Sequence, residues 1–165
     1  MSAAYDPAPW GNFFFAQVGA SAALIGLLFV AVSINLAKII ELPALPGRAF
    51  EALTVLAMVL FVSTFALVPG QSVTSLGLEI LGAALAAWTT SGIIQLKAPH
   101  HPSAPLRWTL IRVAATQLAT LPMLAAGVSL LIGRGGGLYW TVFAVVASLL
   151  AALIDAWVLL VEIQR

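Results

Sequence analysis

Five long apolar stretches fill most of the 165-residue chain. Each has the roughly 20 residues that an α-helix needs to cross about 30 Å of hydrocarbon. Apolar segments of this kind cross a bilayer as helices, because every backbone polar group must then be hydrogen-bonded within the segment. We therefore expect an all-α integral membrane protein, a compact bundle of five transmembrane helices at residues 12–38, 49–68, 72–96, 106–132 and 138–161.

The gaps between these stretches differ sharply in basic charge. Six of the seven Lys and Arg residues fall near Lys38, Lys97 and the C-terminal Arg165, in regions that share one side of a five-span bundle. Arg134 is the single basic residue on the other side. Loops rich in Lys and Arg stay cytoplasmic. The pattern predicts a multi-pass protein of the inner membrane with its N-terminus outside and its C-terminus in the cytoplasm.

Composition excludes several classes of function. Charged residues make up 8% of the chain, against about 25% in a soluble domain, so residues 1–165 form one domain within the bilayer. The chain has no cysteine, and His100 and His101 stand side by side in a Pro-rich loop without a third ligand. We expect no enzyme activity, no cofactor and no metal. A net charge of +1 gives no reason to expect nucleic-acid binding.

Small residues recur every seven positions in the first stretch, at Gly19, Gly26 and Ser33, with Ala23 on the same side. Membrane helices gain contact energy by close approach through such faces, because lipid supplies no hydrophobic drive for pairing. We expect the first stretch to pack centrally. The face could serve a monomer packed on itself or a contact between subunits.

Ionisable residues inside the spans are the first candidates for function, because their burial in lipid is costly. Arg112 and Asp155 lie about six residues from the cytoplasmic ends of the fourth and fifth stretches, so an antiparallel hairpin would pair them. Such a pair could be a structural clasp or part of a gate. Asn35, Gln95 and Glu51 could complete a polar cluster there, although Glu51 is expected to be solvated at the interface.

Glu79 lies roughly 10 Å below the outer end of the third stretch, with no basic residue expected at its depth. Gln17 and Ser63 are expected among its neighbours. Glu79 is then either a protonated or hydrogen-bonded structural residue, or a site for a cation or proton. Both interpretations stay open.

Thr116, Gln117 and Thr120 lie near the middle of the fourth stretch, just before Pro122. Their polar side chains could line a permeation path. They could equally satisfy the backbone carbonyl that a proline within a helix leaves without a donor.

Residues 19–35, GASAALIGLLFVAVSIN, resemble the first span of a group of small uncharacterised bacterial multi-span inner-membrane proteins. The resemblance covers about a tenth of the chain. It implies a bacterial inner-membrane origin, but no activity and no functional residue.

The leading hypothesis from the sequence is a homo-oligomer that passes an ion or small solute across the inner membrane. It is motivated by polar groups at several depths without a catalytic set. The alternative is a non-catalytic accessory or assembly subunit that packs against another membrane protein. A lipid-handling protein is a third possibility and would need an apolar lateral groove. The expected partners are the lipid bilayer and either further copies of the chain or another membrane protein.

Overall fold

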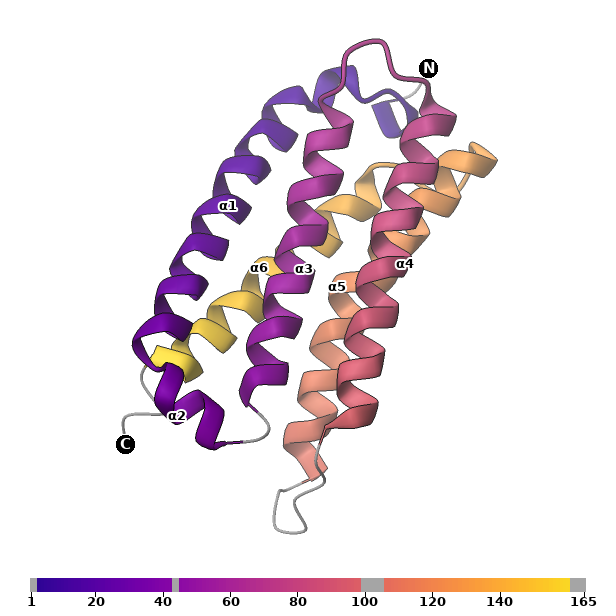
Figure 1. Cartoon of the computed structure of the whole chain (residues 1–165). Coiled ribbons are helices and arrows are strands. Elements are labelled where there is room, and N and C mark those ends of the chain that lie inside the picture. Colours follow the sequence, from indigo (N-terminus) through magenta and orange to yellow (C-terminus); the bar gives the residue numbers. More distant parts are fainter. Residues whose placement is uncertain (1–2, 43–44, 99–105, 161–165) are drawn as a thin grey trace.

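The structure, a computed structural model, describes residues 3–42, 45–98 and 106–160, and the regular structure in these ranges is helical (Figure 1). The helices are α1 (Gly11–Ile34), α2 (Leu36–Glu41), α3 (Leu45–Ala66), α4 (Val73–Lys97), α5 (Leu106–Ile132) and α6 (Tyr139–Leu160). All except the short α2 are long and apolar enough to cross a membrane. The prediction of an all-α chain with five helices of spanning length is confirmed.

Local sequence sets where these helices begin and end. The amide of Ser75 donates to Oγ of Ser72, which caps α4 at a distance of 3.0 Å. Gly70 turns the chain between α3 and α4 with a φ of 72°, a conformation that glycine adopts without strain. At Asn35 the backbone leaves helical geometry, with φ −104° and ψ 14°. The first stretch, expected to be continuous from 12 to 38, is therefore divided into α1 and α2.

α3 lies at the centre of the bundle. It packs against α1, α4 and α6, while α5 lies between α4 and α6 (Figure 1). In the most apolar part of α3, 56% of the residues are buried, against 17% in α1. The expectation that the first stretch packs centrally is wrong, because the second occupies that position.

The burial pattern of α1 explains this correction. Its buried residues include Phe14, Ser21 and Leu28, which recur every seven positions and face α3 and α6. Gly19 and Gly26 repeat with the same spacing on another side of the helix, and both are exposed. A Cβ built on either glycine meets no atom within 4 Å. The small-residue face of α1 therefore lies on the outside of the bundle.

Two apolar clusters fill the interior. The larger lies toward the end that holds the N-terminal segment and joins all five long helices through residues such as Phe14, Val62, Ile80 and Met123. The smaller lies toward the other end, around Leu56, where α1, α2, α3 and α6 meet. Apolar side chains therefore fill the bundle toward its N-terminal end.

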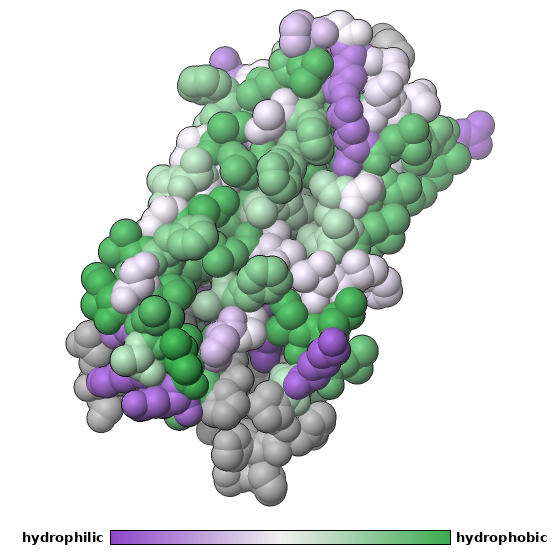
Figure 2. Space-filling model, in the orientation of Figure 1, coloured by the Kyte–Doolittle hydropathy of each residue, from purple (hydrophilic) through white to green (hydrophobic). Residues whose placement is uncertain are grey.

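The face of the molecule shown in Figure 2 is largely apolar in its middle and more hydrophilic toward the two ends. Large side chains are more than half exposed on several helices, among them Phe15 on α1, Leu118 on α5 and Phe143 on α6. Water would solvate such a surface poorly, whereas lipid chains match it. The surface is compatible with a multi-pass membrane protein.

Candidate functional site

A buried carboxylate on the central helix is the main polar feature of the bundle. Glu51 lies in the second turn of α3, and only 4% of its surface is exposed. Arg112 of α5 donates from Nε to Oε2 at 2.7 Å, and its Nη2 lies 2.5 Å from the same oxygen. The expectation that Glu51 is solvated at the interface is wrong, because the packing of α3 against α4 and α5 encloses it.

Two neutral donors complete the shell of Glu51. Thr116, one turn beyond Arg112 on α5, donates from Oγ1 to Oε1 at 2.6 Å. Gln95 of α4 donates from Nε2 to the same Oε1 and also to Oγ1 of Thr116, at 3.0 Å in the second case. Since each carboxylate oxygen has a donor, the buried charge of Glu51 is compensated within the chain.

A second ion pair lies beside the first. Nη2 of Arg48 is 2.8 Å from Oδ1 of Asp155, and Nε of Arg48 donates to the same oxygen at 3.0 Å. The expected pair between Arg112 and Asp155 is therefore not formed, because α3 places Glu51 and Arg48 nearer to them. Two acidic and two basic side chains from α3, α5 and α6 make up this cluster, and their formal charges cancel. We call Arg48, Glu51, Gln95, Arg112, Thr116 and Asp155 the inner network.

Arg48 is a residue of this site that the sequence reasoning missed. The sequence predicts a second span that begins at residue 49 and so leaves Arg48 in the preceding loop, whereas α3 begins at Leu45. The signal was its spacing from Glu51: residues three apart share one face of a helix. A basic and an acidic residue at that spacing indicate a helix that forms ion pairs with charged residues of two neighbouring helices.

Asn35 lies at the same end of the bundle, at the junction of α1 and α2. It is 5% exposed, and its Nδ2 donates to the carbonyl of Ala31 at 3.2 Å. The same carbonyl also accepts from the backbone amide of Asn35 at 3.3 Å, so the main chain and the side chain of Asn35 both bond to the last turn of α1. Asn35 thus stabilises the break between the two helices.

Glu79 lies near the opposite end, in the second turn of α4. Its Oε2 accepts a hydrogen bond from Nε2 of Gln71, in the turn that precedes the helix. Gln17 of α1 is partly buried, and its Oε1 has no hydrogen-bond partner among the described residues. The hydroxyl of Ser63 on α3 is buried and has none there either. The structure thus gives Glu79 a partner in the turn before its own helix.

The candidates in the middle of α5 have separate surroundings. Thr120 is buried and donates to the carbonyl of Thr116 at 2.8 Å. Gln117 faces α4, where its Oε1 accepts from the indole nitrogen of Trp88 at 3.0 Å. Thr116 belongs to the inner network. These three side chains make contacts in different directions, with α3, α4 and the backbone of α5.

The inner network can lock helices together, since every charge in it has a partner of opposite sign. Among the described residues no three His, Asp or Glu side chains come together as metal ligands, and His100 and His101 lie outside the described residues. Comparisons with protein-family models, with curated proteins and with solved structures gave no match to this chain.

Proposed function

We propose that this chain is a non-catalytic accessory or assembly subunit of the inner membrane, which packs against another membrane protein through the outward face of α1. The observation that carries the proposal is the position of that face. Ala16, Gly19, Ala23, Gly26 and Ser33 are all exposed, although α1 packs on α3 and α6 with its other side.

The chemistry of α1 limits the kind of partner. The helix contains no charged residue along Gly11–Ile34, and its outward face carries the small residues together with exposed large apolar side chains, among them Phe15 and Val30. Such a face lets another helix backbone approach closely, which is how contact energy arises between helices in lipid. The partner we propose is therefore an apolar transmembrane helix of another protein.

The inner network supports the same function. Its four charges are paired within the chain, and the larger apolar cluster fills the bundle beyond it. This arrangement suits a rigid scaffold. The proposed orientation keeps the N-terminus outside and the C-terminus in the cytoplasm, because Lys38, Arg48 and Lys97 lie at the end where α2 lies.

Site-specific photo-crosslinking in cells that naturally express the chain tests the proposal. A photoreactive phenylalanine analogue replaces Ala23 on α1 or, as the matched control, Leu150 on α6; both positions are exposed and apolar. We expect one stoichiometric membrane protein to be captured from position 23 and not from position 150. Equal capture from both positions, or capture of this chain alone, would contradict the proposal.

A second candidate is the passage of an ion or small solute by a homo-oligomer. It is favoured by buried polar atoms without partners among the described residues: Oε1 of Gln17 and the hydroxyls of Ser63 and Ser91. Buried polar atoms of this kind are commonly satisfied by water. In liposomes, this candidate predicts ion or proton flux that Glu79→Gln abolishes and that Arg134→Gln, at the same end, leaves unchanged. No flux across common ions leaves the accessory function as the better account.

A further inference from the structure

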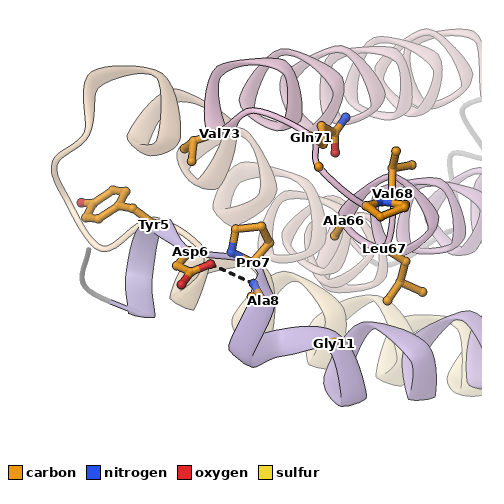
Figure 3. A pocket seen from close by; sticks show the side chains of 12 residues that line it. Tyr5, Asp6, Pro7, Ala8, Gly11, Ala66, Leu67, Val68, Gln71 and Val73 are labelled. Carbon is orange, nitrogen blue, oxygen red and sulfur yellow. Dashed lines mark hydrogen bonds between the residues drawn. The ribbon is translucent and has the colours of Figure 1, made fainter.

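A cavity of about 440 Å³ opens at the end of the bundle opposite the inner network. One wall comes from the N-terminal segment, with Asp6, Pro7 and Gly11, and the other from residues 66–73, the end of α3 and the turn into α4 (Figure 3). Small-molecule sites span about 300–1,000 Å³, so the cavity has room for a small organic ligand.

Among the residues that line the cavity, Asp6 carries the only formal charge. Oδ1 of Asp6 accepts from the amide of Ala8 at 3.0 Å, whereas Oδ2 has no hydrogen-bond partner among the described residues. Nε2 of Gln71 donates one of its two hydrogens to Glu79, and the amide oxygen of Gln71 can accept a hydrogen bond from a ligand. No basic side chain lines the cavity. These acceptors suit a ligand that is a cationic donor.

The rest of the lining is apolar. It comes from Leu67, Val68 and Val73 and from two prolines, Pro7 and Pro69. Leu67 and Val68 are also exposed at the surface, beside the end of the apolar span α3. The cavity therefore has a negatively charged wall and an apolar wall, and it lies at the ends of the membrane-spanning helices. An amphipathic ligand fits both sides at once.

We propose that this cavity binds an organic ammonium group that carries a short apolar chain, with Asp6 as the counter-charge and Gln71 as a second acceptor. This site is independent of the proposed packing function of α1. The ammonium could come from a free amine or from the headgroup of an aminophospholipid. Both sources present the same N–H donors to Asp6.

Calorimetric titration of the full chain in phosphatidylglycerol nanodiscs tests the proposal, with n-butylammonium chloride as the probe and n-butanol as its neutral match. We expect saturable binding of the amine and none of the alcohol. Asp6→Asn keeps an acceptor for the amide of Ala8 but removes the charge, and should weaken binding about tenfold.

A second variant tests the volume of the cavity. Gly11 begins α1 with helical φ and ψ of −51° and −47°, and a Cβ there meets no atom within 4 Å. Gly11→Leu should fill the cavity and abolish binding. Gly82→Leu is the matched control: it adds the same side chain on α4, where a Cβ also meets no atom within 4 Å and which lies outside the cavity lining, and it should leave binding unchanged.

The lipid composition separates the two sources. If a headgroup occupies the site, nanodiscs containing phosphatidylethanolamine should weaken the apparent affinity for n-butylammonium by competition, whereas a site for free amines should bind equally in both lipids. Equal binding of n-butanol, or unchanged binding in both Asp6→Asn and Gly11→Leu with intact helical circular dichroism, would overturn the proposal. Absence of saturable binding in phosphatidylglycerol would overturn it as well.

Discussion

Replacing Arg112 with methionine tests whether the inner network holds α3 against α5. The side chain of Glu51 is 5% exposed and that of Arg112 20%, so the change leaves a buried carboxylate without its cation. Breaking a buried pair on one side costs about 3–5 kcal/mol. We expect Arg112→Met to lower the free energy of unfolding by about 3 kcal/mol, at the low end of this range, because Gln95 and Thr116 still donate to Glu51.

The double variant Glu51→Leu with Arg112→Met separates the charge from the packing. Removing both charges avoids an unpaired ion, and such replacements are often close to neutral. The Thr116 hydroxyl, which loses Glu51, can donate to the backbone carbonyl of residue 112, 3.2 Å away. We therefore expect the double variant to lie within about 1 kcal/mol of the unmodified chain, well above the single variant in stability.

The neighbouring pair provides the comparison. The side chains of Arg48 and Asp155 are 32% and 20% exposed, so solvent screens them more than the pair of Glu51 and Arg112. Arg48→Met should cost about 1 kcal/mol. The assay is reversible SDS titration in dodecylmaltoside micelles, followed by far-UV circular dichroism. The reasoning is refuted if Arg112→Met costs no more than Arg48→Met, or if the double variant is as unstable as Arg112→Met.

Two further predictions concern the contact of α5 with α4 and the hydrogen bond that holds the N-terminal segment. A Cβ on Gly127 of α5 would lie 2.8 Å from the backbone nitrogen of Leu81 on α4, whereas Gly82 faces open space. Gly127→Ala should therefore destabilise the chain by about 1–3 kcal/mol in the same titration, and Gly82→Ala should not; equal effects would contradict this close approach. Tyr5 accepts at its hydroxyl from the amide of Gly136 at 3.1 Å. Tyr5→Phe should cost about 1 kcal/mol and speed hydrogen exchange at Gly136, and unchanged exchange would mean that this bond does not hold the N-terminal segment.

The number and kind of long helices could be read from the sequence. Runs of about 20 apolar residues have few stable forms other than a helix, and the prolines and glycines between them mark where helices stop. The face of α4 with Gly77, Ala84 and Ser91, three small residues spaced by seven, is buried. At Gly77 a Cβ would come within 3.2 Å of Leu130 on α5, so the absent side chain permits the contact.

The charged partners could not be read in the same way. In an antiparallel hairpin Arg112 and Asp155 lie at the same depth, and the predicted pair rested on this depth alone. Which acid meets Arg112 depends on a third helix whose charged side chains reach both of them. That helix is α3, whose Arg48 and Glu51 lie three residues apart on one face and take up one partner each. Which helix lies beside which in a bundle cannot be read from a single apolar sequence.

The sequence by itself determined that this protein is all-helical, with five stretches long enough to span a membrane, because length and hydropathy are local properties of the chain. Only the tertiary structure decided which side of each helix faces inward. In α1 the series through Phe14 and the series through Gly19 both repeat every seven residues, so periodicity cannot choose between them. The choice fell to packing, because Phe14 and Leu28 fill the space beside α3 and leave Gly19 and Gly26 on the outside.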